Sequence, residues 1–129
     1  MAKARKNTRK ADFNEMVDIA LRMAVSWGLK LPERARLLGF DEDVGDNPEY
    51  LSHQLKFCGK GNDVEERCEL VIDIKSRLAG LLDADDKAEK RWLDVKQESM
   101  GNRTPKSLMV SGDIADLRLI SGLLQRVTG

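Results

Sequence analysis

The stretch of sequence that decides the fold is VEERCELVIDIKSRLAGLL, which spans residues 64–82. Its apolar residues recur at intervals of three and four, which is the spacing of one face of an α-helix. The stretch therefore predicts a long helix with a broad apolar face, made of Val64, Cys68, Val71, Ile72, Ile74, Lys75, Leu78, Leu81 and Leu82. Because Cys68 lies on this face, we expect its thiol to be buried and structural. Asp63 stands directly before the stretch, where we expect it to cap the helix.

The same spacing recurs on both sides of this helix. It predicts a first helix over residues 12–27, with a stripe of Phe13, Met16, Val17, Ala20, Met23, Ala24 and Trp27. Further helices are expected over residues 31–38, 48–57, 86–94, 105–112 and 114–127, with loops at 40–47 and 95–102. In the helix over 48–57 we expect the apolar contacts to come from Tyr50, Leu51, Leu55 and Phe57. No segment alternates apolar and polar residues as a strand does, so the sequence predicts an all-α, compact multi-helix domain.

The charges cancel over the whole chain but not locally. The 129 residues include 22 basic and 22 acidic ones, and 41% are hydrophobic, which is a composition typical of soluble globular proteins. Residues 1–11 contain several bases and no acid, and we expect this segment to be a disordered tail that is attracted to phosphate or acidic surfaces. Residues 41–49 have the opposite character, with the acids Asp41, Glu42, Asp43, Asp46 and Glu49 and no base.

Residues that could carry chemistry are few and poorly placed. His53 and Cys58 are five positions apart, so they do not share a helix face as residues at i and i+4 would. Cys58 and Cys68 alone cannot supply the four ligands of a structural zinc site. The acids of residues 41–49 do not follow the ligand order of a calcium loop, and Gly59-Lys60-Gly61 is too short for a phosphate-binding loop. The sequence therefore predicts no enzyme active site, no metal and no cofactor.

Segments that direct a chain to or through a membrane are not expected either. There is no run of about 18 apolar residues, and no apolar stretch follows the basic residues at the start of the chain, as it would in a signal peptide. We therefore expect a cytoplasmic protein without a membrane partner, in which both thiols stay reduced.

Residues 101–105 read GNRTP, and they predict a corner between two short helices. Glycine at 101 permits a tight turn, while threonine at 104 and proline at 105 suit the N-cap and the first position of a helix. Gly112 and Asp113 similarly suit a helix stop and the next N-cap. The residues that can close a small core around the corner are Trp92, Leu108, Met109 and Leu117. The turn is expected to project Arg103 and Lys106 outward.

Two groups of residues taken together resemble a known family. The first group is Ala20-Leu21-Arg22, Trp27-Gly28-Leu29 and Ala35-Arg36-Leu37-Leu38-Gly39. The second is Arg91-Trp92-Leu93, Gly101-Asn102-Arg103-Thr104-Pro105-Lys106-Ser107-Leu108-Met109 and Gly112-Asp113-Ile114-Ala115-Asp116-Leu117. In this order they resemble the Xre/MbcA/ParS-like antitoxin family, over about residues 12–127.

The resemblance implies a division into two halves. Residues 12–62 would form an Xre-like helix-turn-helix half that binds operator DNA, and residues 63–129 would form the half that binds a toxin. The implied partner is a RES-domain toxin, an enzyme that consumes NAD. The antitoxin would bind and neutralise it in a type II toxin–antitoxin system, without chemistry of its own and with autoregulation of the operon.

The expected binding residues follow from the resemblance and from the corner. For the toxin partner they are Trp92, Arg103, Thr104, Pro105, Lys106, Leu108, Asp113 and Arg118. For DNA, with a weaker indication, they are Lys3, Arg5, Lys6, Arg9, Lys10, Gln54 and Lys56. Because DNA phosphates would repel the acids of residues 41–49, which precede the helix that would enter the major groove, we expect operator binding to be weak or lost.

Alternatives to this interpretation stay open. The chain could instead be a helix-turn-helix transcription regulator that acts through DNA, or an orphan helical adaptor for some other protein. The residues of the corner also fit a purely structural role. Finally, we expect a homodimer, both from the resemblance and because the apolar stripe over residues 13–27 is broad for one small core to cover.

Overall fold

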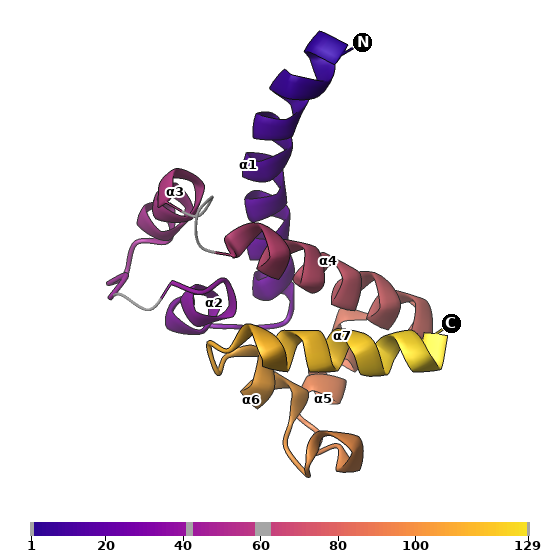
Figure 1. Cartoon of the computed structure of the whole chain (residues 1–129). Helices are drawn as coiled ribbons and strands as arrows, with labels where there is room; N and C mark the ends of the chain where they lie inside the picture. Colours follow the sequence, from indigo (N-terminus) through magenta and orange to yellow (C-terminus); the bar gives the residue numbers. More distant parts are fainter. Residues whose placement is uncertain (1, 41–42, 59–62, 129) are drawn as a thin grey trace.

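The structure, a computed structural model, describes residues 2–40, 43–58 and 63–128. In these ranges it contains α-helices, one short 3-10 helix and no strand, which confirms the predicted all-α class. The elements in chain order are α1 (Ala2–Ser26), α2 (Leu31–Leu37), α3 (Pro48–Cys58), α4 (Val64–Leu81), α5 (Asp86–Leu93), η2 (Glu98–Met100), α6 (Pro105–Met109) and α7 (Ile114–Thr128). Figure 1 shows their arrangement.

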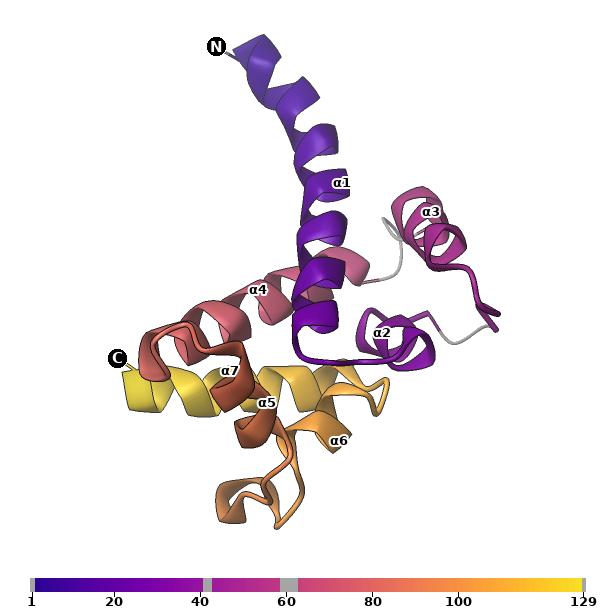
Figure 2. The same cartoon turned by 180° about the vertical axis from the view of Figure 1, so that it is seen from behind.

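The start of the first helix differs from the prediction. We expected a disordered tail over residues 1–11 and a helix from Asp12, whereas α1 begins at Ala2 and runs without a break through Asp12. Alanine, lysine and arginine are among the best helix formers, and neither glycine nor proline interrupts residues 2–12. The basic segment therefore forms the first turns of α1, which project away from the other helices in Figures 1 and 2.

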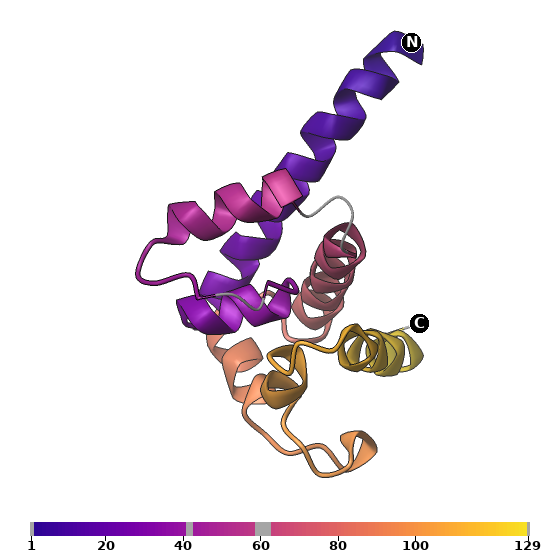
Figure 3. The ribbon, with the colours of Figure 1, turned by 60° about the vertical axis from the view of Figure 1, so that its left-hand side comes forward.

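Helix α4 lies at the centre of the fold and packs against α1 and α7 (Figure 3). The residues that form its buried face are Val64, Arg67, Cys68, Val71, Ile74 and Leu78. This confirms most of the predicted apolar face, although Leu81 at its end is exposed. The centre of the fold is thus decided by the stretch with the strongest helical periodicity.

The apolar stripe of α1 is covered within a single chain. The residues that lie almost fully buried are Phe13, Val17, Ala20, Ala24 and Trp27, each at most 4% exposed. We expected a dimer partly because this stripe is broad, and its burial by α2, α3 and α4 of the same chain removes that reason. The expectation of a dimer then rests on the family resemblance alone.

Side chains cap several helix starts, but the predicted cap Asp63 does not. The Asn47 side chain accepts hydrogen bonds from the amides of Glu49 and Tyr50, at 3.0 and 3.2 Å, before α3. Asp63 was expected to cap α4, but its side chain makes no capping bond and its φ is +50°. Its carboxylate instead accepts a hydrogen bond from Nε of Arg67, at 3.2 Å. Asp63 therefore pairs with Arg67, one turn away, and does not cap the helix.

Arg67 of α4 lies where the turn after α2 meets the segment before α7. It is only 7% exposed, and its Nη2 donates to the carbonyl of Gly112 at 2.9 Å, just before α7. A Cβ placed on Gly39 would lie 2.7 Å from Nε of Arg67. With its φ of +85°, Gly39 is therefore required both for the turn after α2 and for the close approach of the arginine.

Cys68 is buried as predicted, and its reactivity should be low. Burial, together with the charges of Glu65 and Glu69, raises the pKa of the Cys68 thiol to about 12. Because the thiolate is the species that reacts, we expect alkylation of Cys68 in the folded protein at pH 8 to be roughly a thousandfold slower than that of an exposed thiol. Mass spectrometry of the Cys68 peptide after iodoacetamide treatment, with and without urea, checks this. Equal labelling in both conditions would contradict the burial of this thiol.

A carboxylate at the interface of α4 and α7 makes stability depend on pH. Asp73 accepts a hydrogen bond from the Ser121 hydroxyl at 2.6 Å, and Nε of Arg77 donates to both its oxygens at 3.1 Å. Arg77 in turn donates to the Thr128 hydroxyl at 2.7 Å. Burial alone would raise the pKa of Asp73, but these hydrogen bonds and the charge of Arg77 outweigh it and hold the pKa below its ordinary value of 3.8.

We expect the Asp73→Asn variant to lose less stability in acid than the wild-type chain. A carboxyl group whose pKa is lowered by folding stabilises the folded state above its ordinary pKa, and this contribution is lost as the pH falls through the folded-state pKa. The Tm of the wild-type chain should therefore fall a few degrees further between pH 6 and pH 3 than that of the variant. Asp94→Asn, at an exposed position, serves as the control. Equal losses in the wild type and Asp73→Asn would contradict the assignment.

Candidate partner-binding corner

Residues 94–104, which we call the corner loop, connect α5 to α6. Hydrogen bonds between their own backbone atoms hold the two ends of the loop together. Gln97 and Arg103 form an isolated antiparallel bridge, in which the Gln97 amide donates to the Arg103 carbonyl at 3.0 Å. The Asn102 amide donates to the Gln97 carbonyl at 2.9 Å. Gly101 and Asn102 both have positive φ, at +69° and +60°, which glycine and asparagine tolerate better than other residues. The corner loop projects from the helices at the lower edge of Figures 1 and 2.

Met100 holds the corner loop on the body of the protein. Its side chain is 3% exposed and belongs to the core cluster, and η2 lies against α7. The Met100 carbonyl accepts a hydrogen bond from Nε of Arg103 at 3.2 Å. Arg103 itself is exposed. The hydrogen bond to the Met100 carbonyl thus orients the guanidinium. Arg103 faces solvent, as the sequence predicted.

Several of the predicted partner-binding residues have structural roles in the chain. Thr104 caps α6 by accepting a hydrogen bond from the Ser107 amide at 3.1 Å, and Asp113 accepts one from the Ala115 amide at 2.9 Å before α7. Pro105 and Leu108 are buried, and Trp92 is half-buried against the core. These residues form the corner, and their contact with a partner stays a prediction.

The three predicted cations of the region differ in their surroundings. Arg118 is bound by Glu66 through two hydrogen bonds of 2.7 and 2.8 Å, which hold the pKa of Glu66 below its usual value. Lys106 lies 3.8 Å from Glu33 of α2. Arg103 is the cation of the three that has no carboxylate partner in the part of the chain that the structure describes. It is therefore the one most readily available to an acidic or phosphate-bearing partner.

The residues predicted for DNA binding lie on two helices, α1 and α3. Lys3, Arg5, Lys6, Arg9 and Lys10 have their backbone in the first turns of α1, and their side chains lie outside the described part. Lys56 on α3 lies 2.7 Å from the carboxylate of Asp18 on α1, and Gln54 is half-buried. Residues 38–47 separate α2 from α3, which is longer than the three- or four-residue turn of a helix-turn-helix.

The outer face of α3 has a feature that the sequence did not predict. Leu51 and Leu55 are buried as expected, but Tyr50 is 41% and Phe57 is 78% exposed. The ring of Phe57 is parallel to that of His53, with centroids 6.2 Å apart. The prediction that Tyr50 and Phe57 supply apolar contacts is therefore wrong for Phe57 and only partly right for Tyr50, whose ring meets Phe40 edge-on.

The described ranges contain no group of three or more His, Cys, Asp or Glu side chains that could hold a metal ion. None of the helices described combines the length and apolar character that crossing a bilayer requires. The Cys58 side chain, Asp41, Glu42 and Gly59-Lys60-Gly61 lie outside the part described.

Comparison with known proteins returned no match: no family model, no curated protein and no solved structure matches this chain.

Proposed function

We propose that this chain is a cytoplasmic antitoxin that binds and neutralises an NAD-consuming RES-domain toxin, and that it does no chemistry of its own. The observation that carries the proposal is Arg103, an exposed guanidinium that pairs with no carboxylate among the described residues. It lies on a projecting loop that is held by hydrogen bonds between its own backbone atoms. The order of the corner residues, from Trp92 to Leu117, is the feature that resembles antitoxins of the Xre/MbcA/ParS-like family.

The shape of the corner loop supports binding by insertion into a cleft. Its backbone hydrogen bonds and the buried Met100 fix its conformation before a partner arrives, so little conformational entropy is lost on binding. An arginine at the tip can form paired hydrogen bonds with carboxylate or phosphate oxygens. The loop therefore combines rigidity with a cation that has no competing carboxylate in the part of the chain that the structure describes.

DNA binding is a weaker element of the proposal. The ion pair of Lys56 with Asp18 and the exposed carboxylates Asp46 and Glu49 leave α3 poorly suited to a line of phosphates. We therefore place neutralisation in the corner loop and expect any autoregulation through operator DNA to be weak.

Co-expression tests the proposal in cells. The toxin to use is a RES-domain enzyme encoded next to this chain, expressed from an inducible promoter in a host that lacks both genes. We expect the enzyme alone to stop growth and lower cellular NAD, and we expect the chain to restore both. Restoration by the chain with residues 96–103 replaced by a short glycine–serine linker would contradict the role of the corner loop, provided that circular dichroism shows the same helix content.

A further inference from the structure

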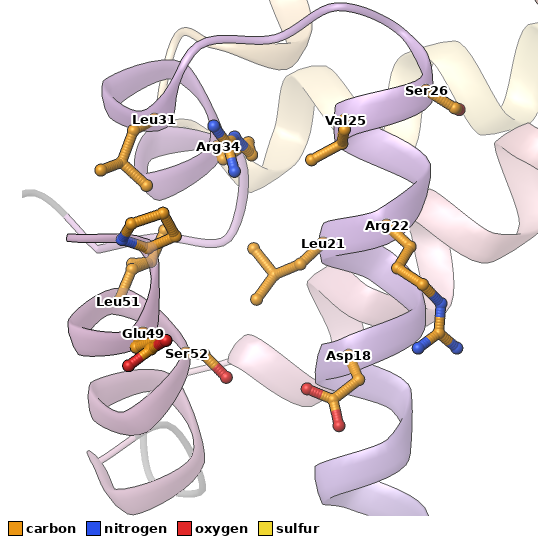
Figure 4. A pocket seen from close by; sticks show the side chains of 11 residues that line it. Asp18, Leu21, Arg22, Val25, Ser26, Leu31, Arg34, Glu49, Leu51 and Ser52 are labelled. Atoms are coloured by element: carbon orange, nitrogen blue, oxygen red, sulfur yellow. The ribbon is translucent and has the colours of Figure 1, made fainter. Parts of the chain in front are cut away.

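A groove separate from the corner loop lies between α1 on one side and α2 and α3 on the other. Its volume is about 530 Å³, which is within the range of roughly 300–1,000 Å³ found for small-molecule sites. Figure 4 shows the side chains that line it. The apolar ones are Leu21 and Val25 of α1, Leu31 of α2, and Pro48 and Leu51 of α3. Val25 is 53% exposed, so much of the apolar wall is open to solvent.

One end of the groove carries an unpartnered donor. Arg34 lies between Leu31 and Val25 in Figure 4, and its Nε is buried with no hydrogen-bond partner among the described residues. A buried donor without a partner destabilises a protein, because the hydrogen bond that it loses to water is not replaced. Arg34 as a residue is half-buried, and a carboxylate that an occupant brings to this end can pair with its guanidinium, whose fork of donors matches two carboxylate oxygens.

The acidic groups of the groove lie toward its other end. Figure 4 places Asp18 and Glu49 away from Arg34. The carboxylate of Asp18 is paired with Lys56 at 2.7 Å, which reduces its effect on a second anion in the groove. Glu49 is exposed and therefore well screened by solvent. The groove thus favours an anion at the Arg34 end and an apolar body along Leu21 and Leu51.

We propose that this groove binds a small apolar monocarboxylate, with the carboxylate on Arg34 and the hydrocarbon body between α1 and α3. The proposal is independent of toxin neutralisation, since the groove is lined by none of the residues of the corner loop. It assigns the groove to a free small molecule. A second copy of the chain, or binding driven by apolar contact alone, are the outcomes that would contradict it.

Octanoate and its neutral isostere octanamide form a matched pair of probes. Both are titrated below any micelle-forming concentration into the full chain, labelled with nitrogen-15, and the amide shifts are followed by NMR. We expect saturable shifts around residues 18–34 and 48–52. A charge-assisted hydrogen bond gives octanoate roughly tenfold tighter binding than octanamide.

Substitutions of residues that line the groove test whether the probes bind there. Arg34→Gln should weaken octanoate about tenfold and leave octanamide unchanged. Val25→Glu, at a half-exposed position that can accept the change without unfolding, should abolish the binding of both probes. Arg91→Gln, at an exposed site on α5, is the control and should bind as the wild-type chain does.

Three results would overturn the proposal. The first is no saturable binding of octanoate, and the second is equal binding of octanoate and octanamide. The third is concentration-dependent dimerisation of the free chain that Val25→Glu abolishes, because the groove would then belong to a second copy. Sedimentation velocity over a wide range of protein concentrations measures this third outcome.

Discussion

The Glu89→Ala variant is expected to lose about 3–5 kcal/mol of folding free energy, the cost of breaking a buried ion pair from one side. Glu89 is fully buried. Its Oε1 accepts hydrogen bonds from Nε1 of Trp27 at 3.0 Å and from Nζ of Lys75 at 2.8 Å. These bonds join α5 to α1 and α4. Removing the carboxylate would leave the indole N–H without its partner. The partly buried ammonium of Lys75 would keep Asp86, at 3.0 Å, as its carboxylate partner among the described residues.

The environment of Lys75 supports the size of this effect. Burial alone would lower the pKa of the Lys75 ammonium, but its hydrogen bonds to Glu89 and Asp86 outweigh burial and raise it. Glu89 and Asp86 together therefore stabilise the charged form of this partly buried lysine.

Urea denaturation of wild type, Glu89→Ala and Glu89→Gln measures the prediction. Glutamine keeps an acceptor oxygen and the shape of the side chain, so Glu89→Gln should lose less than Glu89→Ala. A loss below about 1 kcal/mol in Glu89→Ala would show that the pair contributes no more than an exposed one.

The Arg103→Glu variant is expected to inhibit the RES-domain enzyme roughly 100-fold more weakly than the wild-type chain. Charged residues at the centre of an interface commonly contribute 2 kcal/mol or more to binding, and 1.4 kcal/mol is a factor of ten. Charge reversal replaces attraction by repulsion at the tip of the corner loop. The side chain is exposed and its hydrogen bond is to one carbonyl, that of Met100, so the variant should keep a Tm close to that of the wild-type chain.

Arg91→Glu is the matched control for this prediction, because it reverses an exposed arginine on α5 outside the corner loop. It should inhibit as the wild-type chain does. If both variants inhibit equally well, the corner loop is not the toxin-binding surface. If both are weakened equally, the effect is one of net charge and not of position.

The positions of helices could be predicted because they depend on neighbouring residues. The periodicity of residues 64–82 and the caps at Thr104 and Asp113 involve contacts within a few positions. Predictions from neighbouring residues were wrong at two places where a second local property of the same residues prevails. Asp63 has the identity of an N-cap residue but binds Arg67, and residues 2–11 are polar enough for a tail yet consist of good helix formers.

The remaining features depend on contacts between distant residues. Glu89 lies in a run of polar residues, and nothing in that run indicates that Trp27, 62 positions earlier, donates a hydrogen bond to it. The exposure of Phe57 could not be predicted either, because its apolar character predicts burial. The packing of α3 leaves its side chain uncovered by the described elements. The groove at Arg34 arises from the spacing of three helices. The exposed position of Arg103 could be predicted, because turn residues on both sides define it locally.

The most direct test of the central claim is the NAD consumption rate of the purified RES-domain enzyme as this chain is titrated into it. If the chain is its antitoxin, the rate falls in proportion to the chain added and reaches a minimum at a fixed stoichiometry, while Arg103→Glu shifts the curve to much higher concentration. An unchanged rate of NAD consumption at a large excess of correctly folded wild-type chain would contradict the proposed function.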